Sequence, residues 1–399
     1  MQPRTESASP APTAGVPALL GACCFASLAS LRATDTLLPA LAADFSVSVG
    51  QAARVIFTFA VAYGAFQLFF GPLGDRFGKL RIVAICALAS VIGNGMAFMS
   101  PDLDWLVAAR IVSGACAAGI FPLSMAWIGD NVVYEERQMA LARLVSAGVM
   151  GVLAGQWLSG LITQWVGWRP VFALIALLFL ASGGLLMRVV RAEQLPSVAP
   201  RRGRKRFRDI VGASKSRWIL SFVTVEGALA MGTLAFVPSL LQRHHDVSLA
   251  TAGAIAACYG VGGILYTRVA RRLLGKIGEG GLARLGGALL FVGLVSFAYT
   301  PTLAWAPVAC LLSGFGFYCL HNTLQTQATQ MAPEARGAAM SLFACFLFIG
   351  QSVGIVVAAW MADLGSDRLS FLLAGVGLVA LGFLVSRRTT PRPATESNR

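Results

Sequence analysis

Two acidic residues, Asp35 and Glu226, fall deep inside long apolar stretches of the sequence. A charged side chain at the centre of a lipid bilayer costs roughly 3 kcal/mol or more, so such residues are rare and usually functional. A carboxyl group is stable there only when it is protonated, paired with a base or exposed to water. Both residues are therefore candidates for binding a proton or a substrate cation.

Asp35 has arginines within reach. Arg32 is three residues earlier on the same helical face, and Arg110 enters the fourth apolar stretch at a comparable depth. A pair with either arginine favours the ionised carboxylate, and loss of that pair favours proton uptake. Two interpretations stay open. The pair couples proton binding to helix movement, or it permanently joins the first and fourth stretches.

Glu226 lies about 12 Å into its apolar stretch, at the helical rise of 1.5 Å per residue. Apart from His321, no basic residue of the second half is clearly at that depth. We therefore expect an unpaired carboxyl that is protonated when the pathway is occluded and ionised when water reaches it. Glu226 either binds a proton or substrate cation, or remains a protonated acid held by hydrogen bonds between helices.

The stretches that hold these residues have the composition of membrane helices. The chain has 399 residues, of which 56% are hydrophobic and 13% charged, and its mean hydropathy is +0.71. Crossing a bilayer takes about 20 apolar residues per helix. The sequence predicts twelve spans, at 15–38, 50–72, 82–100, 105–128, 143–165, 169–190, 217–241, 250–268, 283–300, 304–327, 337–361 and 369–386.

The net charge of +14 is explained by membrane topology rather than by a nucleic-acid partner. The protein is expected in the inner (plasma) membrane, with both termini in the cytoplasm. In that orientation most of the 32 Lys and Arg residues fall on the cytoplasmic side. No nucleic-acid partner is therefore expected. The exceptions are Arg169, Arg243 and Arg368 on the external side and Arg32, Arg54 and Arg110 inside spans.

Neither a cofactor nor a metal is expected. All eight cysteines fall within predicted spans, which argues against a disulfide framework. The run His244-His245-Asp246 lacks further ligands, and adjacent side chains seldom chelate one ion together. The sequence also has no catalytic cluster and no Gly-x-x-x-x-Gly-Lys phosphate loop. We expect a protein that is not an enzyme and that uses an ion gradient or the substrate gradient.

The chain divides into two halves of similar pattern. Sliding the second half onto the first by about 190 to 200 residues gives weak but ordered matches, the mark of a duplicated transporter. The matches include Pro39 with Pro238, Gly114 with Gly314, and Gln156 with Gln351. The predicted organisation is a cytoplasmic tail (1–14), an N-terminal six-helix bundle (15–190), a basic cytoplasmic linker (191–216), a C-terminal six-helix bundle (217–386) and a second tail (387–399).

A charged, glycine-rich turn separates the second and third spans. It reads Gly71-Pro72-Leu73-Gly74-Asp75-Arg76-Phe77-Gly78-Lys79-Leu80-Arg81. The turn resembles the pattern Gly-x-Leu-[Ala/Gly]-Asp-[Arg/Lys]-x-Gly-[Arg/Lys] of the major facilitator superfamily. The resemblance implies an all-α membrane protein, with twelve transmembrane helices in two pseudo-symmetric six-helix bundles and a substrate pathway between them.

Two further motifs follow in the order that this family has them. Arg110-Ile111-Val112-Ser113-Gly114 resembles the embedded arginine motif of the fourth span. Residues 151–160 resemble the fifth-span antiporter motif Gly-x-x-x-Gly-Pro-x-x-Gly-Gly, with Gln156 in place of its proline and Ser159 in place of a glycine. The chain is thus similar to the drug–proton antiporter branch but lacks the proline that marks it. Glycines 151, 155 and 160 are expected to serve close helix packing.

The resemblance implies a role for each polar cluster. It places the first, fourth, seventh and tenth spans around the cavity, and a latch at the cytoplasmic gate. The expected proton-coupling residues are Asp35, Glu226, Arg110 and Arg32, and the expected cavity residues are His321, Asn322, Gln325, Gln156 and Gln351. The expected gate residues are Gly71, Gly74, Asp75, Arg76, Gly78, Lys79 and Asp130. For His321 a substrate contact, a proton relay and a packing role stay open.

The expected function is secondary active transport by alternating access. Proton-coupled efflux of small amphipathic or cationic, drug-like molecules is favoured. Glu226 suits a cation, whereas Arg32 and Arg110 suit an anion, so import or export of a sugar, organic acid or other metabolite is the alternative. A non-transporting membrane sensor is the alternative of another class. The expected partners are a small-molecule substrate, protons and membrane lipids, and the chain is expected to be a monomer.

Overall fold

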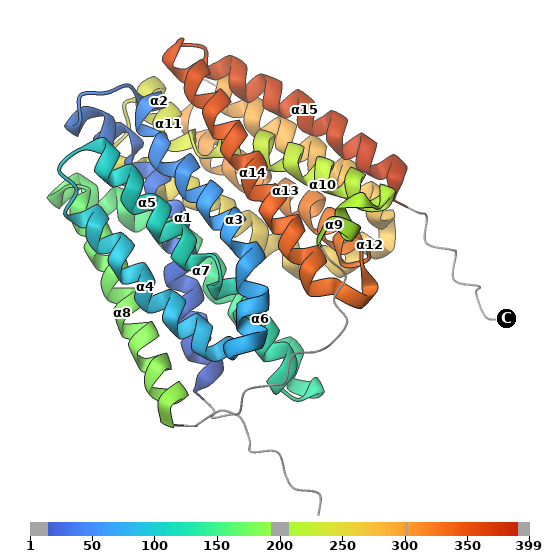
Figure 1. The fold of residues 1–399 in the computed structure, drawn as a ribbon. Helices are drawn as coiled ribbons and strands as arrows, with labels where there is room; N and C mark the ends of the chain where they lie inside the picture. The colour runs from blue at the N-terminus through green and yellow to red at the C-terminus, as the bar shows by residue number, and fades with distance from the viewer. Residues whose placement is uncertain (1–14, 193–206, 300–301, 390–399) are drawn as a thin grey trace, which may run out of the picture.

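The computed structural model describes residues 15–192, 207–299 and 302–389, and these residues are almost entirely helical, with no β-strand among them. Figure 1 shows the helices running roughly side by side in two groups. The predicted tail 1–14, the linker residues 193–206 with their basic run, and residues 390–399 lie outside the described part of the chain.

The first bundle contains helices α1 to α8. Their bounds are Val16–Asp44 (α1), Val49–Ala52 (α2), Arg54–Phe77 (α3), Lys79–Phe98 (α4), Leu103–Ala117 (α5), Ile120–Asn131 (α6), Tyr134–Val166 (α7) and Arg169–Ala192 (α8). Helices α5 and α6 together form one membrane-crossing stretch, Leu103–Asn131.

The second bundle contains the remaining helices. Their bounds are Phe207–Gly212 (α9), Ser214–Glu226 (α10), the π-helix Gly227–Gly232 (η1), Val237–His245 (α11), Leu249–Tyr299 (α12), Leu303–Trp305 (η2), Ala306–Thr329 (α13), Pro333–Ala335 (η3), Arg336–Asp363 (α14) and Asp367–Arg388 (α15). Helices α10, η1 and α11 together form the crossing stretch Ser214–His245.

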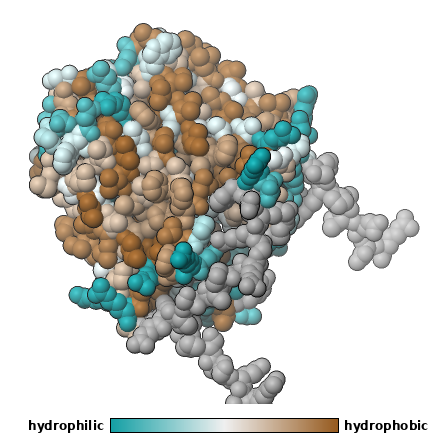
Figure 2. Space-filling model, in the orientation of Figure 1, coloured by the Kyte–Doolittle hydropathy of each residue, from teal (hydrophilic) through white to brown (hydrophobic). Residues whose placement is uncertain are grey.

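Eleven helical stretches of the described residues are long and apolar enough to cross a membrane. The longest, α12, has 51 residues and contains Gly278, whose φ of 66° and ψ of 179° are not helical. This kink separates the predicted spans 250–268 and 283–300, so the chain makes the twelve crossings expected from its sequence. Figure 2 shows the corresponding surface, a largely hydrophobic face with hydrophilic residues gathered toward its edges.

Short hydrogen bonds join the two bundles at the end that carries α2 and α11, which we call the α2 end (Figure 1). Asp363 of α14 accepts from Ser48 Oγ at 2.7 Å and from the backbone N–H of Gly50 at 2.9 Å. Gln164 of α7 accepts from the backbone N–H of Ala250 at 3.4 Å. Side chains at the ends of α7 and α14 therefore hold the first turns of helices in the opposite bundle. We call the other end the α6 end.

Glycines set the closest helix contacts within and between the bundles. A Cβ atom built on Gly155 would lie 2.9 Å from Ala29 Cα of α1, and one on Gly160 would lie 2.8 Å from the backbone carbon of Leu249. One on Gly354 of α14 would lie 2.7 Å from Ala228 Cα. These distances leave no room for a side chain. The expected packing role of the fifth-span glycines therefore agrees with the structure.

Candidate functional site

Glu226 lies where the seventh span changes from α-helix to π-helix. It is the last residue of α10, and the π-helical turn η1 follows directly. Such turns are rare and often occur at functional sites, because the extra residue re-aims the side chains beside it. Gly227 allows η1 to pack onto α14, since a Cβ there would lie 3.0 Å from the backbone nitrogen of Gln351. The π-turn thus holds Glu226 against the interior.

Glu226 is fully buried, and its Oε2 lies 2.9 Å from Nδ1 of His321. The expectation of a largely unpaired carboxyl is therefore wrong: the residue that the sequence placed at a similar depth is its partner. The second oxygen, Oε1, is buried and has no hydrogen-bond partner in the described part of the chain. One carboxyl oxygen is thus bound, and the other could take up a proton without losing a hydrogen bond.

Aromatic rings fix His321 in place. Its ring stacks on Phe317 at 4.9 Å with an interplanar angle of 12°, and Phe343 of α14 lies 5.3 Å away. The side chain of His321 keeps 13% of its surface exposed, whereas Glu226 keeps none. The imidazole therefore stands between the buried carboxyl and more accessible space. Asn322 and Gln325, on the same helix α13, are both partly buried.

Asp35 of α1 pairs with Arg32 rather than directly with Arg110. Arg32 Nη1 lies 3.2 Å from Asp35 Oδ2, and both side chains are buried. The other oxygen, Oδ1, has no hydrogen-bond partner among the described residues. Of the two partners that the sequence allowed, the structure selects the arginine one turn away. Asp35, like Glu226, therefore has one carboxyl oxygen bound and one that is buried without a partner among the described residues.

Arg110 is held by the backbone and hydroxyl groups of its neighbours. It donates to the carbonyl of Ser30 at 2.9 Å and to Thr34 Oγ1 and the carbonyl of Val55 at 3.4 Å each. Its guanidinium lies 4.0 Å from the ring centroid of Phe59, a cation–π contact. Arg110 thus joins α1, α3 and α5 next to Asp35, without a direct ion pair to it within the described residues.

The two glutamines of the repeat are both buried, and each has an unpartnered amide oxygen. Gln156 of α7 is 5% exposed and Gln351 of α14 is 1% exposed, and Oε1 of each lacks a hydrogen bond within the described chain. Gln156 lines a small cavity between the bundles together with Arg32. Gln351 adjoins the π-turn through its backbone. The structure thus groups Arg32, Asp35 and Gln156, and separately Glu226, His321 and Gln351.

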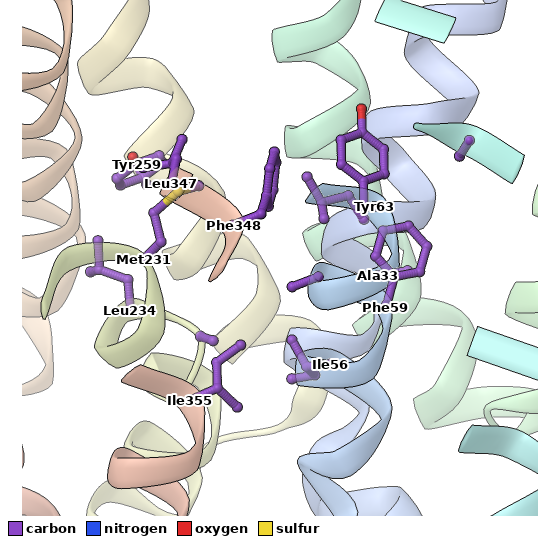
Figure 3. Packing of buried hydrophobic residues seen from close by; sticks show 14 of the residues in the cluster. Ala33, Ile56, Phe59, Tyr63, Met231, Leu234, Tyr259, Leu347, Phe348 and Ile355 are labelled. Carbon is purple, nitrogen blue, oxygen red and sulfur yellow. The ribbon is translucent and has the colours of Figure 1, made fainter. Parts of the chain in front are cut away.

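Two tyrosines that sequence reasoning missed face the space between the bundles. Tyr259 of α12 lines the same cavity as Arg32 and Gln156. Tyr63 of α3 packs against Phe348 of α14, with ring centroids 4.8 Å apart (Figure 3). A signal was available, because a Tyr-Gly pair occurs in the second span of each half, at Tyr63 and at Tyr259.

The gate motif forms a charge cluster at the α6 end. Lys79 contacts Asp75, with Nζ and Oδ1 3.6 Å apart, and it also forms an ion pair with Asp130 of α6. Gly78 has φ of 91°, a conformation that favours glycine, and it is the single residue between the end of α3 and the start of α4. A side chain at Gly74 would collide with Leu123. The structure therefore gathers the central acids and the lysine of the motif.

The remaining motif residues are more peripheral. The guanidinium of Arg76 lies 5.0 Å from the centroid of the neighbouring Phe77 ring. At Gly71 nothing lies within 4 Å of a Cβ position, so space does not explain why glycine occurs there. At the α2 end, His244 bonds through Nε2 to Asp367 Oδ2 at 3.2 Å, and Arg368 Nη2 lies 3.3 Å from its Nδ1. Arg243 Nη2 also lies 3.5 Å from Asp367 Oδ2, so His244 and Arg243 are the two basic partners of this acid.

Comparison with known proteins agrees with this architecture. The family model described as "Major Facilitator Superfamily" matches residues 20–343. The lincomycin resistance protein of Streptomyces lincolnensis is 27% identical, and the match covers 86% of this chain and 84% of that protein. The chloramphenicol resistance protein of Streptomyces lividans is 26% identical, and the match covers 88% of this chain and 90% of that protein.

Solved structures show the same fold. A bacterial homologue of the human lysosomal transporter Spinster, in an inward-facing and unoccupied conformation, superposes with a TM-score of 0.73 at 18% identity. The match covers 93% of this chain and 96% of that one. The family match spans most of the sequence, and the helices cross the membrane in the arrangement that this family shares. The chain therefore belongs to the major facilitator superfamily and is a membrane transporter rather than an enzyme.

Proposed function

We propose that this protein exports small amphipathic or cationic organic molecules in exchange for protons. The observation that carries the proposal is the buried pair of Glu226 and His321, in which one carboxyl oxygen is bound and the other has no partner among the described residues. Exchange requires a group that holds either a proton or a cation but not both at once. A buried carboxyl beside a basic ring has this property.

The proposed orientation places both termini in the cytoplasm and the α2 end on the external side of the inner membrane. Lysines and arginines concentrate at the α6 end, where α3 meets α4 and where α8 and α15 finish. Few lie at the α2 end, where Arg169, Arg243 and Arg368 pair with acids or a histidine of their own bundle. This asymmetry supports the orientation through the positive-inside rule.

The proposed cycle uses one buried acid in each bundle. A proton entering from outside neutralises Glu226, and the bundles rock until the α6 end opens. A cationic or amphipathic substrate then displaces the proton into the cytoplasm and takes its place beside the carboxylate. Asp35, paired to Arg32, offers a second acid in the first bundle. The relatives named for resistance to lincomycin and chloramphenicol support outward transport of drug-like molecules.

Proteoliposomes test this function. With an acidic lumen, the wild-type protein should accumulate tetraphenylphosphonium or ethidium against its gradient, and Glu226→Gln should abolish that uptake. Glu279→Gln is the matched control, because Glu279 also accepts a side-chain hydrogen bond, from Gln327, but lies near the α6 end away from the pair. Uphill uptake by Glu226→Gln at the wild-type rate would remove Glu226 from the mechanism. Absence of proton-driven uptake by the wild type would refute export of these cations.

A further inference from the structure

A small cavity lies at the junction of the two bundles, and neither Glu226 nor His321 is among its lining residues. The first bundle contributes Arg32 and Gln156 to its lining. The second contributes Tyr259, together with the largely apolar set Leu234, Val237, Ala256 and Cys310. Figure 3 shows Leu234 and Tyr259 on the side of the interface opposite Ala33, the neighbour of Arg32 in α1. The cavity therefore opens or closes whenever the bundles move relative to each other.

The polar groups around this cavity have unused hydrogen-bonding capacity. The hydroxyl of Tyr259 and Oε1 of Gln156 are buried and make no hydrogen bond within the described chain. Tyr259 is 8% exposed, and Arg32 and Gln156 are each 5% exposed. Buried polar atoms normally have partners, and an unpartnered one costs about 1 to 3 kcal/mol. Two such atoms lining one cavity, from opposite bundles, indicate a place for a polar ligand group.

Arg32, the charged residue of the lining, is paired with Asp35 next to the cavity. Arg32 uses Nη1 to bind Asp35, and a guanidinium carries five N–H donors in all. An anionic group would gain from Arg32 but would meet the carboxylate of Asp35 beside it. A cationic group would gain from Asp35 but would be repelled by Arg32. A neutral group loses nothing to either charge, and it finds donors at Arg32 and Tyr259 and an acceptor at Gln156.

In this structure the cavity is too small for a group larger than about one water molecule. Its volume is about 10 Å³ in this structure, which is about the room that one water molecule needs. The hydrogen bonds of Asp363 and Gln164 hold the bundles together at the α2 end. A larger ligand group therefore fits only if Tyr259 moves away from Arg32 and Gln156.

The geometry points to Tyr259, Gln156 and Arg32 as a subsite for a neutral group with both a hydrogen-bond acceptor and a donor, such as a carboxamide, on the substrate. The carbonyl of that group accepts from Tyr259 and Arg32, and its N–H donates to Gln156 Oε1. The apolar lining from α11 and α12 accommodates the adjoining hydrocarbon. This inference rests on the proposed function only in that the substrate enters between the bundles.

Binding of three matched probes tests the subsite. The probes 4-phenylbutyramide, 4-phenylbutyrate and 4-phenylbutylammonium share one apolar body and differ in the polar end. Calorimetry on the full-length protein in lipid nanodiscs, without any ion gradient, measures each affinity. We expect the amide to bind three- to tenfold more tightly than the carboxylate, because a gain of one or two hydrogen bonds to buried groups corresponds to about that change in affinity. The ammonium probe can also bind beside Glu226, so it serves as the reference for that separate site.

Conservative variants of the lining residues assign the effect to the site. Tyr259→Phe removes only the hydroxyl and should weaken amide binding three- to tenfold, with less than a twofold change for the charged probes. Gln156→Leu should do the same from the opposite bundle. Tyr266→Phe is the matched control, because Tyr266 is a buried tyrosine two turns along the same helix that does not line the cavity, and it should bind as the wild type does.

Two results would overturn the subsite. These are equal affinity for the amide and the carboxylate, and equal amide binding by Tyr259→Phe and Tyr266→Phe. Gln156→Leu keeps the test decisive if Tyr259→Phe does not fold. Amide-selective binding without proton-driven export would retain the subsite and refute the proposed function. Export without amide selectivity would retain the proposed function and refute the subsite.

Discussion

Glu226 and His321 are 95 positions apart in the sequence and 2.9 Å apart in the structure, and they join the seventh and tenth spans in the membrane interior. Each is braced by an unusual feature, the carboxyl by the π-turn η1 and the imidazole by a stack on Phe317. Bracing on both sides means that neither side chain can relax to a new partner without a helix moving. The pair therefore reports the relative position of these two helices.

Breaking this pair should destabilise the protein. His321→Ala leaves the Glu226 carboxyl buried without its partner, a change that typically costs about 3 to 5 kcal/mol for a buried pair. Thermal unfolding in detergent should show a large loss for His321→Ala and a smaller one for the double variant Glu226→Gln/His321→Ala, which contains no buried acid at this site. Equal stability of wild type and His321→Ala would show that the pair contributes nothing to the fold.

The acid in the first bundle should be coupled more strongly to Arg32 than to Arg110. Arg32 bonds Asp35 directly, whereas Arg110 bonds the backbone and hydroxyls around it. Double-mutant cycles with Asp35→Asn should give a coupling of about 1 kcal/mol or more with Arg32→Gln, and a smaller one with Arg110→Gln, in transport rate or in stability. Strict additivity with both arginines would mean that Asp35 acts alone.

The gate motif should control the α6 end. If Asp75 helps to close that end in the outward-facing state through contacts beyond the Lys79 pair seen here, Asp75→Asn removes those contacts, and the population moves toward inward-facing. Spin labels near Arg81 and near Lys276 should then report a longer distance distribution, while substrate affinity changes little. An unchanged distribution with normal turnover would leave this turn as a marker of topology only.

Asp363 should control the opposite end. Asp363→Ala removes acceptors for Ser48 and for the N–H of Gly50, so the α2 end should open more often, and labels across that end should separate. Asp104→Ala is the control, because Asp104 is at the same end but pairs with Arg54 inside its own bundle. The same distance shift in both variants would mean that loss of surface charge, rather than the bond between bundles, opens this end.

Much of the fold could be predicted because it depends on local pattern. The spans follow from apolar length, and the turn at Gly78 follows from a glycine that the backbone requires. The kink at Gly278 supplies the boundary that hydropathy placed between the eighth and ninth spans. Sequence spacing also placed Arg32 one helical turn from Asp35, where the structure shows the ion pair.

The details of the site could not be predicted in the same way. Whether His321 meets Glu226 depends on the rotation of two helices, and the π-turn that sets this rotation has no clear sequence signal. The same holds for Tyr259, whose importance comes from the residues opposite it in the other bundle. Sequence spacing gives depth in the membrane, but partners across an interface come from tertiary packing.

The glycine contacts between α7 and α12 bear on speed rather than stability. Gly160 lies against the backbone of Leu249, and Gly253 lies against the carbonyl of Gln156, so at these points the bundles meet through backbone instead of interlocked side chains. Two smooth surfaces can shear without waiting for rotamers to exchange. The activation barrier for reorientation is then low along this seam, and a bulky residue at Gly253 would slow turnover even with every binding group intact.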